Sequence, residues 1–426
     1  MYPIVGGGDS AASAGLLAPQ GRELLARLAG EEVTPDRALG LSASLRAQYP
    51  ADLVAAALTQ QALRNAARAK FSQAAVMLFT RAGLEQASSE LTARHSAARF
   101  AGARLVADLC CGIGGNLIAL ATAGAQGVVG IDADRLTAVF ARHNVAVGAP
   151  GAQVAVVCAD VTKLPLGGFD ALFIDPARRE GEPRAGGSRA GGFRQSEARA
   201  GERRLTAGHS RPPLAWCLRL AGTVDRVGIK AAPGIRRDLV PGGWETEFVA
   251  VGRDLKEALL WSPGLATAGV TSRATILPGG HSLTGGARSA ARPGERPRVP
   301  LAAPGAYLLD PSPAVTRAGL VAELAGPLGA WQIDPMIAFL SSDEAVKTPF
   351  ARTLRVLESA PWHEKAFARR LRALGIGAAD IRRRGLAGDV TVIHRRLGLA
   401  GPGAATVVLT RVNDRPWGLI CAPLPD

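Results

Sequence analysis

The chain has 426 residues, too many for one compact core, since single cores usually stop growing at about 250 to 300 residues, so we expect two or three domains. Hydrophobic residues make up 47% of the sequence and charged residues 20%, which excludes a largely disordered chain. The formal net charge of +14 favours a polyanionic partner such as nucleic acid, although a basic enzyme of arginine-rich composition would carry the same charge.

The beginning of the chain is expected to be a tail followed by a helical domain. Residues 1–15, MYPIVGGGDSAASAG, lack the basic and apolar regions of a signal peptide and are expected to form a disordered tail. In the segment ADLVAAALTQQALRNAARAKF, alanine and leucine recur every three or four residues, which is typical of amphipathic helices. Residues 16–100 are therefore predicted to form an N-terminal helical domain.

Residues 101–278 alternate short apolar runs with helical segments. The runs LVADL, GVVGI, VAVVC, ALFID and RVGIK predict a parallel sheet that helices cover on both faces. The later runs EFVAV, EALLW and RATIL are expected to complete the sheet, with antiparallel edge strands. The long apolar stretch over 105–131 contains Asp108 and several glycines, so it predicts strand, turn and helix rather than a membrane span.

Two segments interrupt this pattern. Residues 178–211 contain nine arginines against four glutamates, and they are either a lid that captures phosphates or a tolerated surface insertion. Residues 279–304 are rich in glycine, proline and arginine and are predicted to be a linker.

Residues 305–426 predict a smaller α+β domain. Helices are expected at PAVTRAGLVAEL, TPFARTLRVLE and WHEKAFARRLRAL, and a final hairpin is expected to turn at Asn413 and Asp414. The cations at 382–384 and at 395–396 are either solvated surface charges or contacts for an RNA backbone.

The segment LVADLCCGIGGNLIAL carries the strongest signal for a ligand. A strand containing Asp108 runs into a turn with Gly112 and Gly114, and a helix follows. Such glycines let the backbone approach a ligand, and a helix N-terminus offers unpaired N–H groups to it. Asp132 and Asp160 close the next two strands, where an acid can accept ribose hydroxyls or read an adenine amino group. The pattern predicts a site for a nucleotide-like cofactor.

These residues resemble class I S-adenosylmethionine-dependent methyltransferases, because an acid lies inside the first strand and Leu117 stands where dehydrogenases usually have a third glycine. A more specific likeness is to a bacterial family of such enzymes that ends in a THUMP-like domain. It rests on the segments RAKF, LFTRAGLEQAS, HSAARF, DLCCGIGGN, FIDPARR, KAAPGI, SSDEAVKTPFAR and IRRRG. The resemblance covers about residues 20 to 424 and implies a Rossmann-like α/β sheet with an N-terminal helical domain and a C-terminal α+β, THUMP-like domain.

The resemblance also implies a set of cofactor-binding residues. Asp108 and the backbone of Gly112 to Gly114 would hold the methionine end of S-adenosylmethionine, Asp132 the ribose, and Asp160 with Val161 the adenine. The set is completed by Thr80, Cys110, Asn116 and Ala133. Thr80 is equally well explained as an ordinary helix N-cap. Packing is the favoured role of the adjacent thiols of Cys110 and Cys111, because no histidine is near them in sequence.

The fourth strand, which ends in FIDPARRE, is expected to carry the catalytic residues Asp175 and Pro176. Methyltransferases that act on base amino groups have a second proline and an aromatic residue after this Asp-Pro pair, whereas this chain has Ala177 and Arg178. The change favours a phosphate-bearing substrate over a standard base-stacking motif. Arg178, Arg179 and Lys230 are expected to bind the substrate, although Lys230 could equally be a solvent-facing cation at a strand end.

The sequence thus predicts a cytoplasmic S-adenosylmethionine-dependent methyltransferase that acts on RNA, either rRNA or tRNA, without a metal and away from the membrane. The odd number of cysteines, five, with no metal-type spacing, supports a reducing compartment. Two alternatives stay open: an RNA-binding protein that keeps the cofactor fold without turnover, and a methyltransferase for a small molecule or a protein. The oligomeric state, the nucleotide and the methylated atom are not predicted.

Overall fold

The computed structural model describes residues 9–178, 210–286 and 299–424, and these form two compact units. The first unit holds residues 9–178, 210–231 and 261–265 of the described chain, and the second holds the others. The domain limits expected from the sequence stay a prediction. Within the described residues, every helix is too short or too polar to cross a membrane.

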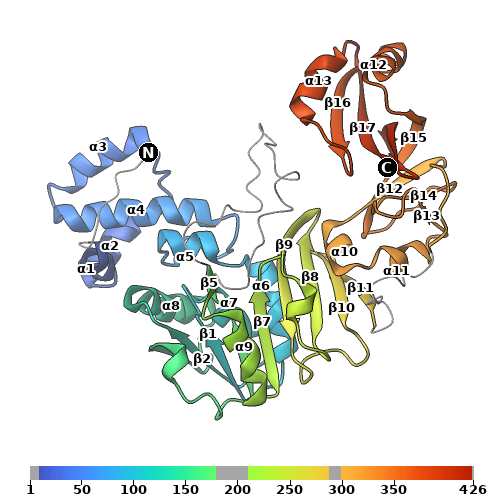
Figure 1. The fold of residues 1–426 in the computed structure, drawn as a ribbon. Coiled ribbons are helices and arrows are strands. Elements are labelled where there is room, and N and C mark those ends of the chain that lie inside the picture. The colour runs from blue at the N-terminus through green and yellow to red at the C-terminus, as the bar shows by residue number, and fades with distance from the viewer. Residues whose placement is uncertain (1–8, 179–209, 287–298, 425–426) are drawn as a thin grey trace. The chain divides into compact units, whose positions relative to one another are not determined.

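The first unit begins with six helices, which confirms the helical character predicted for this region (Figure 1). Proline stands in the first turn of α2 and α3, where its missing N–H costs nothing, and the Ser89 side chain accepts from the backbone of Thr92 to cap α6. The helices are α1 (Asp9–Gly15), α2 (Pro19–Arg27), α3 (Pro35–Leu45), α4 (Ala51–Ala67), α5 (Arg81–Gln86) and α6 (Glu90–Ala97), followed by the 3₁₀ turn η1 (Ala98–Phe100).

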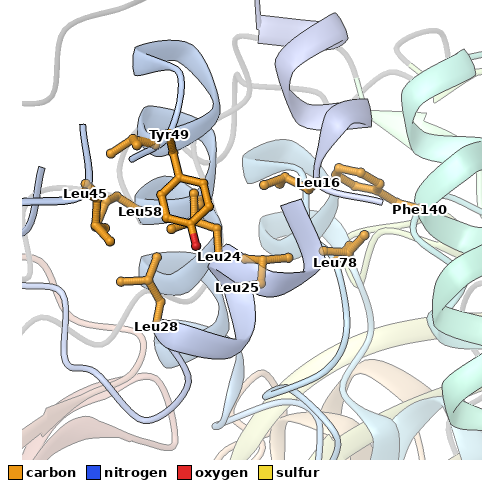
Figure 2. Close-up of a cluster of buried hydrophobic side chains, with 11 residues drawn as sticks. Leu16, Leu24, Leu25, Leu28, Leu45, Tyr49, Leu58, Leu78 and Phe140 are labelled. Carbon is orange, nitrogen blue, oxygen red and sulfur yellow. The ribbon is translucent and has the colours of Figure 1, made fainter. Parts of the chain in front are cut away.

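Helices α2, α3 and α4 share one apolar core with helix α8 (Arg135–Gly148) of the sheet region. Figure 2 shows Leu24, Leu28, Leu45 and Leu58 gathered around Tyr49, with Leu16 and Leu78 on the side of Phe140 of α8. Phe140 is only 1% exposed, and each leucine buried in this way contributes about 2 kcal/mol. The helical region is therefore packed onto the sheet region as part of one unit.

Five parallel strands form the sheet of the first unit, in the order β7-β4-β1-β2-β3. They are β1 (Leu105–Leu109), β2 (Gly127–Asp132), β3 (Val154–Cys158), β4 (Ala171–Ile174) and β7 (Arg226–Ala231), and all five were predicted. Helices α7 (Gly115–Thr122), α8 and α9 (Leu214–Arg219) lie between these strands in the sequence. The same part of the chain contains the 3₁₀ turns η2 (Val161–Lys163) and η3 (Leu220–Gly222) and the two-residue strands β5 (Ala177–Arg178) and β6 (Ser210–Arg211). The strand order reverses between β1 and β4, and ligands bind at such a point beyond the carboxyl ends of the strands.

The second unit contains a group of four strands in the order β11-β10-β8-β9. Three of them were predicted, namely β8 (Glu245–Val251), β9 (Asp254–Trp261) and β10 (Ser272–Leu277). Strand β10 is parallel to β8 and antiparallel to β11 (His281–Gly285), which the sequence did not reveal. The antiparallel strand at the edge of this group is thus β11, and none of the three expected runs forms that edge. The 3₁₀ turn η4 (Arg237–Leu239) precedes β8.

The remainder of the second unit is built on a seven-stranded sheet with the order β13-β14-β12-β15-β18-β17-β16. Its strands are β12 (Tyr307–Pro311), β13 (Trp331–Gln332), β14 (Leu340–Ser342), β15 (Ala351–Pro361), β16 (Ile376–Arg383), β17 (Gly403–Val412) and β18 (Arg415–Pro423). Its helices are α10 (Pro313–Ala318), α11 (Val321–Ala325), α12 (Glu364–Ala373) and α13 (Val390–Leu397). The predicted hairpin is confirmed, since Asn413 and Asp414 turn between β17 and β18 with φ values of 48° and 64°.

The helix expected at TPFARTLRVLE is wrong, because this segment forms most of strand β15. The strand pairs with β12 on one side and β18 on the other, so its backbone hydrogen bonds are made across the sheet. Arg355, Leu357 and Ser359 are exposed and alternate with less exposed neighbours, as expected of a strand with one solvent face. Pairing with β12 and β18 outweighed the helical preference of this segment, whose apolar residues follow no single period.

Candidate functional site

The first strand and the turn after it form an open backbone cradle. Asp108 is fully buried in β1, and the turn that follows has positive φ at Cys110 (62°), Gly112 (56°) and Gly114 (88°). A Cβ placed on Gly112 would meet nothing within 4 Å, so the backbone there is open to an approaching ligand. Gly114 then caps the N-terminus of α7, whose N–H groups face the same turn.

Two buried polar side chains beside this turn are unsatisfied within the described residues. Both carboxylate oxygens of Asp108 and Oδ1 of Asn116 have no hydrogen-bond partner there, which is costly for buried groups. Burial, followed by the nearby charges of Asp175 and Asp132, raises the pKa of Asp108 well above its ordinary value, whereas Lys230 lowers it. A ligand that brought N–H groups or positive charge to this point would satisfy these atoms.

Asp132, at the end of β2, is held in one orientation by the backbone. Its Oδ2 accepts a hydrogen bond from the Gly112 N–H and its Oδ1 accepts one from the Asp134 N–H, each at 2.9 Å. Burial raises the pKa of Asp132, while the backbone hydrogen bonds oppose that shift. Each oxygen keeps a further lone pair, so the carboxylate can accept two hydroxyl groups such as those of a ribose.

The end of β3 contributes one buried and one exposed residue. Asp160 is exposed, and its Oδ1 accepts from the Thr162 N–H at 3.0 Å and from the Thr162 hydroxyl at 2.7 Å. Val161 is buried beside it. Ala133, after β2, is exposed, and its carbonyl lies 3.7 Å from Sγ of Cys158. The three predicted residues Ala133, Asp160 and Val161 therefore lie at neighbouring strand ends.

A network of hydrogen bonds holds Asp175 at the end of β4. Lys230 Nζ donates to Asp175 Oδ2 at 2.7 Å and to Ser88 Oγ at 2.8 Å, and Asn116 Nδ2 donates to the same Oδ2 at 3.3 Å. The Lys230 and Asp175 side chains are 11% and 23% exposed. Oδ1 of Asp175 has no partner within the described residues, so it can accept a proton-bearing group of another molecule.

Lys230 therefore does not end its strand as a solvent-facing cation, because its ammonium group is bound by Asp175 and Ser88. Ser88 is part of the same network and was not predicted as a site residue. The sequence indicated it only as the last residue of the family-like segment LFTRAGLEQAS. Pro176 is half-buried next to Asp175. The backbone of Arg178 pairs with Ser210 in the β5–β6 ribbon, whereas Arg179 and most of the arginine-rich segment lie outside the described residues.

Helix α5 supports the cofactor turn from the side of the helical region. Oγ1 of Thr80 accepts from the Gly83 N–H at 3.0 Å, so Thr80 is the N-cap of α5. Lys70 Nζ donates to the carbonyls of Leu84 at 2.7 Å and Ala87 at 2.9 Å, which satisfies the other end of the helix. A Cβ on Gly83 would lie 2.4 Å from Cγ2 of Ile113, so α5 packs closely on the turn.

Replacing Gly83 with alanine should therefore destabilise the first unit by about 1 to 3 kcal/mol, since the added methyl group overlaps Ile113. Thermal melting should show this as a lower midpoint. Gly40→Ala in α3 is the matched control, because nothing lies within 4 Å of a Cβ there and alanine favours a helix. An equal midpoint for both variants would contradict the close packing of α5 on the turn.

The five cysteines are all free thiols. Burial is the largest of the influences that raise the pKa of Cys110, and it also raises the pKa of Cys111 well above its ordinary value. Such thiols stay protonated at neutral pH and are poor nucleophiles. This supports the packing role expected for the pair.

Comparison with known proteins identifies the family. Residues 106–177 match a methyltransferase domain, residues 351–423 match a THUMP domain-like family, and residues 9–67 match a domain of unknown function. Two proteins of Mycobacterium tuberculosis, from strains CDC 1551/Oshkosh and H37Rv, are described as uncharacterized S-adenosylmethionine-dependent methyltransferases. Each is 37% identical over 339 residues, which is 79% of this chain and 85% of the relative.

The chain belongs to the S-adenosylmethionine-dependent methyltransferases. A candidate methyltransferase structure from Porphyromonas gingivalis W83 has a TM-score of 0.71 over the whole of both chains at 20% sequence identity, so the fold is shared along the full length. The resemblance stated from the sequence is confirmed for the family, the class I fold and the THUMP-like domain.

The residues at the strand ends of this methyltransferase fit the cofactor. S-adenosylmethionine carries an ammonium group and a sulfonium, which suit the unsatisfied carboxylate of Asp108, and ribose hydroxyls, which suit the oriented carboxylate of Asp132. When bound, it supplies an electrophilic methyl group. In this structure the backbone at Gly112 is open, and Lys230 binds Oδ2 of Asp175.

Asp132→Ala should weaken S-adenosylmethionine binding by about 100-fold, because hydrogen bonds to a charged group are worth about 1.5 to 3 kcal/mol. Isothermal titration calorimetry measures this affinity directly. Asp52→Ala, which removes an exposed carboxylate from α4, should bind as tightly as the unmodified methyltransferase. Unchanged affinity in a folded Asp132→Ala variant would overturn the ribose role.

Proposed function

We propose that this methyltransferase transfers a methyl group to RNA. The observation that carries the proposal is the match of residues 351–423 to the THUMP domain-like family, because that resemblance implies RNA binding. The net charge of +14 supports it, since such a field attracts polyanions and speeds their association.

The exposed cations of two helices support an RNA contact in the C-terminal region. Helices α12 and α13 pack against each other and against β16. They carry exposed side chains of Lys365, Arg369, Arg372, Arg395 and Arg396. Cations spaced along two adjacent helices suit successive phosphates of a nucleic acid backbone.

The arginines at 382–384, interpreted from the sequence as either solvated charges or RNA contacts, have protein partners. Arg382 NH1 lies 2.7 Å from Oδ2 of Asp310, and Arg384 NH2 lies 3.2 Å from Oδ1 of the same buried carboxylate. Arg383 donates to the Leu386 carbonyl at 2.7 Å. We therefore assign the phosphate contacts to α12 and α13, and a structural role to 382–384.

The arrangement at Asp175 favours an acceptor that carries a hydrogen. Oδ2 is bound by Lys230 and Asn116, whereas Oδ1 can accept a hydrogen bond from an N–H or O–H group of the substrate. Methyl transfer needs an in-line approach of the acceptor, so a rigid carboxylate that positions it lowers the barrier. The proposed reaction takes place in the cytoplasm, a reducing compartment that suits five free cysteines.

The test is S-adenosylhomocysteine release when the purified methyltransferase is incubated with S-adenosylmethionine and total cellular RNA. We expect release that ribonuclease treatment abolishes and that rising salt reduces. Release that survives ribonuclease would contradict an RNA substrate. Cofactor binding without release would also contradict it, and release on adding a ribonuclease-treated cell extract would then separate a methyltransferase for a small molecule or a protein from an RNA-binding protein without turnover. Mass spectrometry of the nucleosides would then identify the methylated position.

A further inference from the structure

A cavity of about 490 Å³ lies between the start of the helical region and helix α8, within the first unit. Leu17 and Arg22 border it from the loop before α2 and from α2 itself. Residues of α8 and of β3 line the rest. None of the predicted site residues lines it. Its volume is in the range of sites for small ligands, about 300 to 1,000 Å³, and suits one nucleotide better than a double helix.

Among the described residues that line the cavity, the arginine and histidine side chains are the only ionisable groups besides the thiol of Cys158. Arg22, Arg135, Arg142 and His143 line it, and its lining contains no acidic residue. Arg135 and Arg142 are exposed and make no ion pair or hydrogen bond within the described residues. By contrast, Arg22 Nε donates to the Leu17 carbonyl at 2.7 Å, and His143 Nε2 lies 2.9 Å from the Val76 carbonyl. Arg135 and Arg142 lie about two helical turns apart on α8, and both guanidinium groups are thus available to an anion.

The remaining lining is apolar. It consists of Leu17, Ala138, Val139, Ala146, Val156 and the thiol of Cys158. A free phosphate would use the arginines but leave this apolar lining exposed to water. A nucleotide uses both, because its base has apolar faces and its phosphates are anionic.

We propose that this cavity binds one nucleotide of a single-stranded part of the RNA substrate, with its base against the apolar lining and its phosphates at Arg135 and Arg142. The inference rests on the proposed function. Strand β3, whose Val156 and Cys158 line the cavity, is three positions from β4 in the sheet, so these two residues lie roughly 14 Å from Asp175 at a spacing of about 4.8 Å per strand. The cavity therefore reads a nucleotide other than the methylated one.

The charge contribution is tested with Arg135→Glu/Arg142→Glu and fluorescence anisotropy of labelled single-stranded RNA. We expect at least about 10-fold weaker binding at 0.1 M salt and a smaller salt dependence, by about one unit of slope for each lost phosphate contact. Arg46→Glu/Arg219→Glu makes the same change in net charge at exposed positions outside the cavity and should bind almost as the unmodified protein does. Calorimetric affinity for S-adenosylmethionine verifies that each variant is folded.

The base contribution is tested with Ala146→Trp, which fills the cavity without removing a charge. The unmodified protein should bind RNA more tightly than a ribose-phosphate strand of equal length without bases, and this preference should shrink in the variant. Equal binding of the two strands by the unmodified protein would show that only phosphate is bound and would overturn the nucleotide assignment.

The two proposals can fail separately. If the unmodified protein binds RNA and Arg135→Glu/Arg142→Glu binds it equally well, the cavity is not a nucleotide site, although the proposed function stands. If the unmodified protein binds no RNA, both proposals are overturned.

Discussion

Asp175→Asn should reduce methyl transfer by about 100-fold or more while S-adenosylmethionine binds with unchanged affinity. The substitution keeps the size of the side chain but removes the charge that positions an acceptor hydrogen, and groups of this kind contribute about 10²- to 10⁴-fold to rate. Asparagine can still accept hydrogen bonds from Lys230 and Asn116, so the local structure should survive. The measurements are S-adenosylhomocysteine release under single-turnover conditions and calorimetry with the cofactor.

Asp170→Asn is the control for Asp175→Asn. Asp170 lies directly before β4 and Asp175 directly after it, so the two substitutions make the same chemical change at opposite ends of one strand. Its Oδ2 accepts from the N–H groups of Arg104 at 2.8 Å and Leu105 at 3.1 Å, which is a structural role at the opposite end of the strand. We expect some loss of thermal stability in Asp170→Asn but nearly full turnover. If Asp175→Asn turned over as fast as this control, Asp175 would have to be regarded as structural.

Lys230→Met should lower both activity and stability. It removes the ammonium group that neutralises Asp175 next to the buried carboxylate of Asp108 and the half-buried carboxylate of Asp132. Removing one partner of a fully buried ion pair costs about 3 to 5 kcal/mol, and the partial exposure of this pair reduces the expected cost to about 2 kcal/mol. The melting temperature should therefore fall by about 4 °C or more, and turnover should fall at least about 10-fold.

Lys256→Met is the matched control for Lys230→Met, because Lys256 lies 3.5 Å from Asp254 in an exposed pair and should contribute almost nothing. A double-mutant cycle separates the roles further. If Lys230 acts by positioning Asp175, adding Lys230→Met to Asp175→Asn should cost little further activity. Fully additive losses would instead assign Lys230 to a direct contact with the substrate.

Local pattern explains why the catalytic sheet could be predicted. Each of its five strands is an apolar run bounded by turn residues, and Asp108, Asp132 and Asp160 lie where the parallel strands bring their carboxyl ends together. The glycine turn could be predicted for the same reason, since its positive φ values leave few choices of residue.

Contacts between distant parts of the sequence explain what could not be predicted. Lys230 is 55 residues from Asp175 and 142 from Ser88, so no local spacing indicates that these side chains meet. Arg382 and Arg384 look like a free basic cluster until β12 brings the buried Asp310 beside them. Strand β15 was missed for a related reason, because its two neighbours in the sheet decide its conformation.

The hydrogen bond from Lys230 to Ser88 limits where the chain can be shortened without loss of activity. Phe71 and Ser88 both precede the first strand, yet Phe71 shares an apolar cluster with Ile113 of the turn and Ser88 accepts a hydrogen bond from Lys230. A shortened protein beginning near residue 101 would keep every strand of the sheet but lose the side chains that support the turn and the lysine. Gene fusions or exchanges that preserve activity should therefore carry the helical residues before the sheet together with it, so the functional module begins well before its first strand.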